Sequence, residues 1–277
     1  MASKPWKFGI LYRSLNDSEF PLTLQIHACA GKPEAEPTED YVRSPKDVAL
    51  RNLKKYEEGG NDLQGRQLQA DRGFTCYELV KDLETQFKMT FLGTIQANRK
   101  GLPKSFTATE GRPVGDYMVL YEENSNISIH SEIFKNKTGL KNVMFMTSAV
   151  PVLARTNDDT RRTFLNNVYN FTMGGTDRVD QMMSSYSCRF KSRRWTMNFL
   201  AYAIDTARVN ARTINMMLRE DQKFEDSRVF GFAIARGLVT PHILRRQSGP
   251  GIQIYIKKAA DAYLGKFLLF TSVSRRI

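Results

Sequence analysis

The chain has 277 residues, of which 41% are hydrophobic, so it is long enough for one large domain or two modest ones. Lys and Arg number 41 against 29 Asp and Glu, and the net charge of +12 predicts a polyanionic partner, most commonly nucleic acid. No run approaches ~18 consecutive apolar residues, and the three cysteines lie far apart, which argues against a membrane span, a CxxC metal site or a disulfide framework.

Predicted strands and helices alternate in the first part of the chain. Residues 7–15 and 22–28 predict an antiparallel hairpin around the turn signal Asn16-Asp17-Ser18. Apolar spacing predicts helices over residues 46–58 and 76–87, and strands are expected over residues 66–70 and 89–96. Asp17 and Asp71 each follow the end of a predicted strand.

The pattern changes in the next segment, where three short strands are expected over residues 117–121, 127–134 and 143–148. We interpret residues 105–167 as a β-rich insertion, after which helices return near Asp177. A long helix is predicted over residues 194–220 and another over residues 228–236, whereas residues 251–277 show no clear pattern. The long helix carries an apolar stripe that we expect to face the core, made of Phe199, Leu200, Ala203, Ile204, Ala207, Ala211, Ile214 and Leu218.

Residues 170–194 are the most informative stretch. Two glycines and Thr176 open a predicted helix, and Asp177 and Asp180, three residues apart, share one of its faces. An acidic helix start followed by basic residues fits a site that holds a divalent metal against a phosphate backbone. The simpler interpretation makes Thr176 an N-cap and assigns the aspartates to the helix dipole. The basic residues that follow are Arg189, Lys191, Arg193 and Arg194.

Two basic segments are candidates for contact with DNA phosphates. One is the loop at the end of the strand over residues 89–96, with Arg99, Lys100 and Lys104, for which a plain surface loop is the alternative. The other is the run over residues 189–194, which also fits a nuclear import signal or a solvated helix start. Trp195 fits a core anchor better than a base-stacking residue.

Several motifs along the chain carry a resemblance to a known family. They are residues 7–10 leading to Asp17, Gly31-Lys32, Asp71 with Phe74-Thr75, residues 93–104, residues 169–181, and residues 192–195 leading into Asn210-Ala211. With these motifs, the chain resembles the catalytic region of piggyBac-type transposases and their host-domesticated relatives. The resemblance extends over roughly residues 5–246, and the blocks around Arg99 and Asp177 are its most specific parts.

This resemblance implies an α/β fold, a ribonuclease H-like DDE/D transposase core with a β-rich insertion before the last catalytic helix. The family's catalytic, metal-binding triad falls on Asp17, Asp71 and Asp177, and Asp180 falls on a further acidic position. The three carboxylates are expected to converge at one end of a single sheet and to hold two Mg²⁺ or Mn²⁺ ions roughly 3.5–4 Å apart. Such enzymes cut DNA at element ends, pass through a hairpin intermediate and join the ends at TTAA. DNA is thus the implied partner, in the nucleus, without a membrane or a small-molecule cofactor, and a homodimer is left open.

The resemblance also predicts the domain organisation. Residues 5–104 would form the first part of the core, residues 105–167 the insertion and residues 168–246 the helical second part, with residues 247–277 unassigned. The long N-terminal region and the cysteine-rich zinc module of the family are not recognised in this sequence, so a truncated or domesticated copy is expected.

The chain departs from the family after its second aspartate, where Arg72, Gly73 and Cys76 replace the usual residues. Arg72 would compete with a metal for the Asp71 carboxylate, or alternatively point towards a phosphate. Whether the chain is an active enzyme therefore stays open. The alternative is a catalytically inactive, transposon-derived DNA-binding protein, and a basic RNA-binding protein is a third interpretation.

Overall fold

The computed structural model of the chain describes residues 10–29, 44–99, 101–137, 139–149, 163–192, 194–219, 226–247 and 249–265. The chain divides into two compact units, residues 1–213 and residues 214–277. The boundary falls inside helix α6 (Trp195–Leu218), and each unit is described by itself.

The first unit begins with the predicted hairpin, in which β1 (Leu11–Asn16) pairs antiparallel with β2 (Thr23–Cys29). Helix α1 (Pro45–Glu58) packs against both strands. The helix starts as its sequence dictates, because Ser44 accepts a hydrogen bond from the backbone N–H of Asp47 and proline occupies the first turn. Asn52 of this helix donates to the Arg13 carbonyl oxygen of β1 at 3.2 Å.

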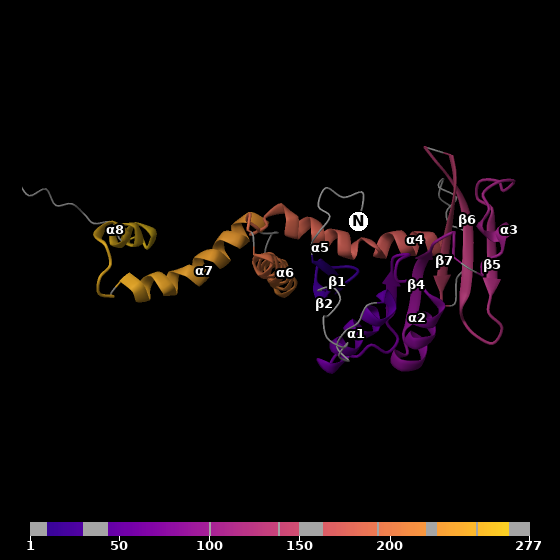
Figure 1. Cartoon of the computed structure of the whole chain (residues 1–277), viewed down its shortest axis with the longest axis horizontal. Helices are drawn as coiled ribbons and strands as arrows, with labels where there is room; N and C mark the ends of the chain where they lie inside the picture. The colour runs from indigo at the N-terminus through magenta and orange to yellow at the C-terminus, as the bar shows by residue number, and fades with distance from the viewer. Residues whose placement is uncertain are drawn as a thin grey trace, which may run out of the picture. The chain divides into compact units, whose positions relative to one another are not determined.

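A five-stranded sheet follows, in the order β3 (Gln67–Ala70), β4 (Thr90–Ile95), β7 (Gly139–Thr147), β6 (Ser128–Asn136) and β5 (Tyr117–Tyr121) (Figure 1). β3 and β4 are parallel, and the other neighbouring pairs are antiparallel. Because β7 pairs directly with β4, the strands of residues 105–167 extend the sheet that β3 and β4 begin.

The expectation that Asp17 and Asp71 end strands of a single sheet is wrong for the described residues. β1 pairs with β2 in a separate two-stranded sheet, whereas β3 pairs with β4. β3 has only four residues, and its Gln69 side chain bonds to helix α4 (Phe164–Thr172), through the carbonyl oxygen of Tyr169 at 2.8 Å. The Gln69 side chain therefore joins β3 to α4.

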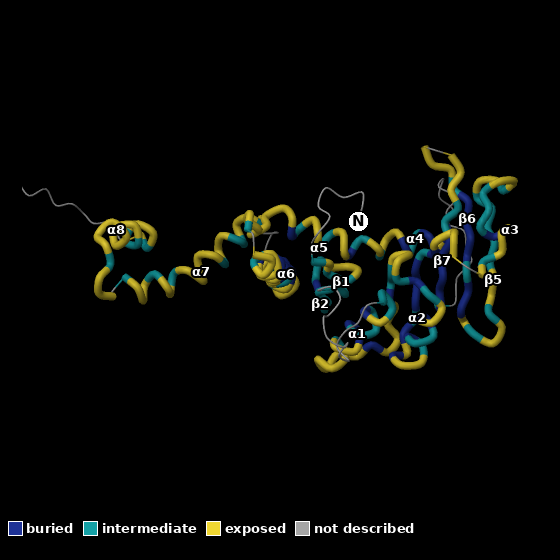
Figure 2. The backbone as a smooth tube through the Cα atoms, viewed as in Figure 1, coloured by how far each residue is buried: buried dark blue, intermediate teal, exposed yellow. Residues whose placement is uncertain are grey.

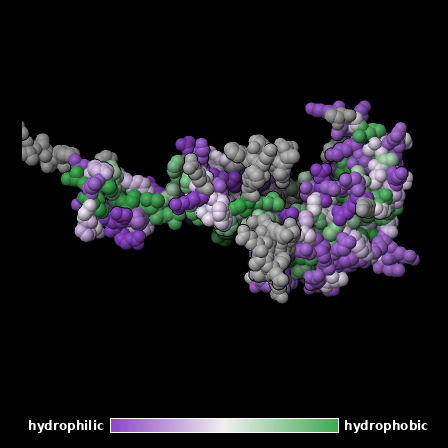
Figure 3. Space-filling model, in the orientation of Figure 1, coloured by the Kyte–Doolittle hydropathy of each residue, from purple (hydrophilic) through white to green (hydrophobic). Residues whose placement is uncertain are grey.

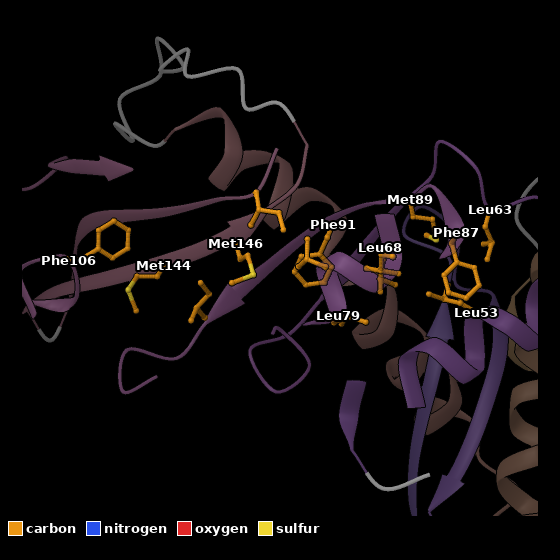
Figure 4. Packing of buried hydrophobic residues seen from close by; sticks show 14 residues of the cluster. Leu53, Leu63, Leu68, Leu79, Phe87, Met89, Phe91, Phe106, Met144 and Met146 are labelled. Carbon is orange, nitrogen blue, oxygen red and sulfur yellow. The ribbon is translucent and has the colours of Figure 1, made fainter. Parts of the chain in front are cut away.

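The main hydrophobic core is built from the sheet and the helices packed against it, and α1 contributes Leu53. Helix α2 (Tyr77–Asp82) continues into a single π-helical turn, η1 (Leu83–Phe87), so the helix expected over residues 76–87 is only partly α-helical. The short helix α3 (Lys104–Thr107) adds the buried Phe106. Figure 4 shows the packing of this core, and Figure 2 shows that buried positions gather in β4, β6 and β7. The labelled core residues are Leu53, Leu63, Leu68, Leu79, Phe87, Met89, Phe91, Phe106, Met144 and Met146.

Two helices lead from the sheet towards the hairpin. Thr163 caps α4 and donates from its N–H and its hydroxyl to the buried Glu132 of β6, at 2.9 and 2.8 Å. After Met173 the chain continues as α5 (Gly174–Ser185). The predicted helix opening at the two glycines is confirmed, but Thr176 is not its N-cap, since the helix starts two residues earlier and no side chain caps it.

Helix α6 forms where predicted, but the opposite face from the expected one is buried. All eight residues of the apolar stripe are exposed, and Trp195 is 66% exposed, so its expected role as a core anchor is wrong. Hydrogen bonds explain the orientation, because Asn210 both donates to and accepts from the backbone of Thr23, at 2.8 and 2.9 Å. Thr213 also donates to the Pro21 carbonyl oxygen at 3.0 Å. The buried residues of α6 are Ala201, Tyr202, Asp205, Thr206, Val209 and Thr213.

The second unit contains α7 (Ser227–Gln247) and α8 (Ile254–Tyr263). The helix expected over residues 228–236 thus runs on to Gln247, and Pro241 lies inside it without ending it. Neither helix has a buried residue, and apolar side chains lie on their surface (Figure 3). Among the helices of the described segments, none combines the length and apolar character needed to cross a membrane.

Candidate active site

Asp17 lies in the tight turn that follows β1. Its backbone N–H donates to the Leu22 carbonyl oxygen at 2.9 Å, which closes the hairpin. Its carboxylate oxygen Oδ1 accepts hydrogen bonds from the backbone N–H groups of Glu19 and Phe20, each at 2.8 Å. One oxygen of this carboxylate thus holds its own turn, an Asx-type arrangement that aspartate favours.

Asp71 lies in a similar turn after β3. Its Oδ1 accepts from the backbone N–H of Arg72 at 2.7 Å, and its carbonyl oxygen accepts from the N–H groups of Phe74 and Thr75 at 2.9 and 3.3 Å. Asp71 and Arg72 are both exposed. The hydrogen bond that Arg72 donates to the Asp71 carboxylate comes from its backbone N–H and not from its guanidinium.

Asp177 lies in the first turn of α5, and this turn rests on the turn of Asp17. A β-carbon placed on Gly175 would lie 2.4 Å from the Asp17 carbonyl oxygen, so only glycine allows the approach. Thr176 accepts a hydrogen bond from the Asn16 side-chain amide at 2.9 Å. The hydroxyl predicted to cap the helix instead joins it to the end of β1. The structure therefore brings the backbone elements of Asp17 and Asp177 together.

Arg178 strengthens this contact, although the sequence predicted no role for it beyond membership of a motif. Its guanidinium donates to the carbonyl oxygen of Ser18, and to that of Glu19 at 3.0 Å. It also donates to the Gly174 carbonyl oxygen of its own helix at 3.3 Å. One planar fork thus bridges α5 and the loop after Asp17, a geometry that lysine cannot reproduce.

Helix α4 joins the same region to β3. Gln69 of β3 lies two residues before Asp71. Its side-chain oxygen accepts a hydrogen bond from the Thr172 hydroxyl, and its side-chain amide donates to the Tyr169 carbonyl oxygen. Tyr169 is buried against Phe145, with ring centroids 5.2 Å apart. Its pKa is raised, first by burial and further by the negative charge of Asp71, while a hydrogen bond with Thr94 opposes the shift. Tyr169 was not identified as a site residue from the sequence.

Asp180 lies one turn after Asp177 on α5. Asp180 is exposed, and its pKa is raised, mainly by partial desolvation of the carboxyl and secondly by the Asp177 charge, whereas Arg189 lowers it. Arg189 also lies over the Tyr202 ring, 5.9 Å from its centroid, and Tyr202 stacks on Tyr12 with centroids 3.8 Å apart. Asp180 and Arg189 therefore belong to one cluster with two tyrosines.

The donor chemistry of the site suits a hard divalent cation, but its side chains are not gathered around one. Asp17, Asp71 and Asp177 offer carboxylate oxygens, and the buried Asn16 Oδ1 beside Asp17 has no hydrogen-bond partner among the described residues. In the part of the chain that the structure describes, however, no group of three His, Cys, Asp or Glu residues is placed to hold a metal ion. Backbone contacts bring the turn of Asp17 and the first turn of α5 together, and the convergence of the three carboxylates stays a prediction.

The predicted DNA-contacting residues are distributed over two surfaces. Arg99 is exposed and its guanidinium donates to the Thr75 carbonyl oxygen, while Lys104 is exposed at the start of α3. Lys191 and Arg194 are exposed in the segment before α6. Lys100 and Arg193 lie outside the described residues.

Asp205, which the sequence did not single out, anchors the basic segment to α6. Its carboxylate is 1% exposed and accepts hydrogen bonds from the Ser187 hydroxyl at 2.6 Å and from the Cys188 backbone N–H at 2.9 Å. A buried carboxylate is stabilised in this way by donors at both oxygens. The residues immediately before Arg189 are therefore fixed by a charged hydrogen-bond acceptor.

A family model described as Transposase IS4 matches residues 1–212. No curated protein sequence matches the chain. Among solved structures, the chain is similar to the piggyBac transposase in a cryo-EM structure of its synaptic complex with hairpin DNA, with a TM-score of 0.79 and 24% identity. This similarity covers 95% of the chain and 53% of the solved one, so the chain spans about half the length of that transposase. It confirms the predicted ribonuclease H-like fold.

Proposed function

The chain belongs to the Transposase IS4 family, and from this premise we propose that its first unit cleaves and joins DNA strands by metal-dependent phosphoryl transfer. The observation that carries the proposal is the seating of α5 on the turn of Asp17, through Gly175 and the hydrogen bond between Asn16 and Thr176. It supports a shared site because residues far apart in the sequence meet where two of the three aspartates lie. The bonds of Gln69 to α4 support the inclusion of Asp71.

In this proposal, Asp17, Asp71 and Asp177 would hold two Mg²⁺ or Mn²⁺ ions. Such ions, when bound, activate a water or 3′-hydroxyl for attack on phosphorus and stabilise the leaving oxygen. Arg178 keeps the loop after Asp17 against α5. Asn16 fixes the first turn of α5 through Thr176. Exposed Lys191 and Arg194 neutralise the phosphates of the bound strand.

The similarity to piggyBac transposase extends the proposal to cleavage at element ends, a hairpin intermediate and joining at TTAA. DNA in the nucleus would be the substrate, with a homodimer as the form that holds two ends. These finer points rest on the resemblance, and each needs a test separate from strand cleavage.

A second candidate is a catalytically inactive DNA-binding protein, and one observation favours it. The Oδ1 atoms of Asp17 and Asp71 are both engaged by backbone N–H groups, and no three carboxyl groups in the described segments are placed to hold a metal. Metal binding would have to draw these side chains together.

Nicking of supercoiled DNA distinguishes the two candidates. The enzyme is expected to convert supercoiled to nicked DNA with Mg²⁺ or Mn²⁺ and to lose this activity on Asp177→Asn. The control is Asp62→Asn, which changes an exposed aspartate in the segment between α1 and β3. Binding of DNA without metal-dependent nicking would support the inactive candidate. Nicking that survives Asp177→Asn would place the activity elsewhere and contradict the proposed site.

A further inference from the structure

A hollow of about 300 Å³ lies beside the turn that follows Asp71, within the first unit. The start of α1 forms one wall, and the segment between β3 and α2 forms another. Arg99, from the loop after β4, completes the lining. The residues that matter for its chemistry are Lys46, Gly73, Phe74, Cys76, Glu78 and Arg99.

The size of the hollow limits what it can receive. Small-molecule sites in proteins typically enclose about 300–1,000 Å³, so this one is near the lower end of that range. A double helix is far too wide to enter. A single unpaired nucleotide is a group of suitable size, because only its base and its adjoining phosphate need to be accommodated.

The walls combine an aromatic ring with positive charge. The Phe74 ring lines the hollow together with Lys46 and Arg99. Outside the lining, the Arg13 guanidinium lies 5.5 Å from the centroid of that ring. Aromatic rings and guanidinium groups are the surfaces on which unpaired bases stack. Phe74 is partly exposed and lines the hollow, so it offers such a surface three residues after Asp71.

The two cations of the wall differ in how they are held. Lys46 forms an ion pair with Asp82 at 2.9 Å, so part of its charge is already neutralised. Arg99 donates to the Thr75 carbonyl oxygen, which fixes its guanidinium against the same wall. Because Lys46 is already paired, Arg99 is a better phosphate ligand than Lys46. The Glu78 carboxylate lines the same hollow, so it repels an anion there and limits the affinity for a phosphate.

We propose that this hollow receives one unpaired nucleotide of DNA, with its base against Phe74 and its phosphate beside Arg99. The proposal rests on the proposed function, because it places a nucleotide next to Asp71. Unlike a general basic surface, such a hollow would bind unpaired DNA and not paired DNA.

Cys76 lines the hollow and provides a built-in probe. The test protein carries Cys29→Ser and Cys188→Ser, which leaves Cys76 as its one thiol. Its rate of reaction with a maleimide is measured without divalent metal, alone and with oligothymidine or a blunt-ended duplex. Fluorescence anisotropy establishes that each DNA is bound. At a concentration ~10 times its dissociation constant, oligothymidine is expected to slow the reaction about tenfold, since labelling requires the free protein. The duplex is expected to leave the rate nearly unchanged.

Three charge variants in this background locate the effect. Arg99→Gln should weaken the protection by oligothymidine, and Glu78→Gln should strengthen it, while duplex binding changes little in both. The matched control is Lys104→Gln, an exposed cation that does not line the hollow and should affect both DNAs equally. A protein with Cys29 as its one thiol controls for shielding of any cysteine by bound DNA, because Cys29 lies on β2, outside both basic segments.

Two results would overturn the proposal while leaving the proposed function intact. One is binding of oligothymidine without protection of Cys76. The other is equal protection of Cys76 by duplex and oligothymidine. If neither DNA binds, both the proposed nucleotide site in the hollow and the proposed function are overturned. Because the assay contains no metal, a loss of nicking activity alone has no bearing on it.

Discussion

Gly175 lies against the backbone of Asp17, so closely that a β-carbon at Gly175 would stand 2.4 Å from the Asp17 carbonyl oxygen. Gly175 is buried, and the Cα of Ser18 would also lie within 3.3 Å of that carbon. No side-chain rotation relieves a contact with backbone atoms. The first turn of α5 can therefore keep its position on the turn of Asp17 only while residue 175 is glycine.

Gly175→Ala is expected to lower the free energy of unfolding by about 1–3 kcal/mol, because the added carbon overpacks the contact between α5 and the Asp17 turn. Urea unfolding measures the effect. Gly174→Ala is the matched control, since its β-carbon would meet only the Arg178 Nε at 3.8 Å. That variant should be neutral or gain up to ~1 kcal/mol from helix propensity. Equal losses in both variants would show that the approach to Asp17 is not the cause.

Arg178→Lys is expected to lower the nicking rate at least about tenfold, since small misplacements of a catalytic group are costly. The physical reason is that one ammonium group cannot bridge the carbonyl oxygens of Ser18, Glu19 and Gly174 as the guanidinium does. Arg178 is a positioning residue in this account, so Arg178→Met should reduce the rate similarly. The rate is measured on supercoiled DNA with saturating Mn²⁺. Full activity of the lysine variant would mean that charge alone, and not the bridge, matters at residue 178.

Asp205 and Ser187 are expected to be strongly coupled. The buried carboxylate accepts from the Ser187 hydroxyl at 2.6 Å, and hydrogen bonds to charged groups contribute about 1.5–3 kcal/mol. In a double-mutant cycle of Ser187→Ala and Asp205→Ala, the coupling free energy from urea unfolding should fall in that range. Thr206→Ala in place of Asp205→Ala controls for packing, because Thr206 is buried on the same helix without bonding Ser187. Additive losses in the cycle would argue against an anchored basic segment.

The sequence predicts the order of the elements well, because alternation and helical spacing are local properties. The hairpin, β3, β4, the three later strands, and the start of α5 at the two glycines all lie close to their expected positions. The requirement for glycine at 175 and the bridge of Arg178 were not predictable, since each depends on the loop after Asp17, about 160 residues away. Backbone contact across that separation leaves no periodic signal.

Helix α6 shows why hydrophobic spacing can mislead. Its apolar stripe was expected to be buried, yet the buried face includes Asp205, Thr206 and Thr213. Each of these polar side chains has a hydrogen-bond partner, so burial costs little free energy. Apolar spacing cannot distinguish a buried face of a helix from an exposed apolar one. The residues that decide which face of α6 is buried, such as Thr23 and Pro21, lie elsewhere in the chain. The candidate triad came from motif resemblance, and its metal-holding geometry stays a prediction.

His130 should make stability depend on pH. It is fully buried on β6, with Nε2 2.8 Å from the Ser128 hydroxyl and Nδ1 next to the Tyr117 hydroxyl. Burial lowers its pKa from 6.5 to about 4. Between these two values the unfolded chain binds a proton that the folded chain does not, so the free energy of unfolding falls as pH falls. The stabilisation is fully present above the unfolded pKa and is lost on acidification towards the folded one.

From about pH 7.5 to about pH 5 the loss attributable to His130 is expected to be about 2 kcal/mol. Urea unfolding at both pH values measures it, and His130→Gln should remove that share of the loss because glutamine does not titrate. His242→Gln, at an exposed position of α7, controls for replacing a histidine as such. The comparison is the difference between the two pH values within each protein, so a lower absolute stability of His130→Gln does not affect it. If the free energy of unfolding of His130→Gln depends on pH as strongly as that of the parent chain, the buried histidine is not the source of the pH dependence. Carboxyl groups must then be its source.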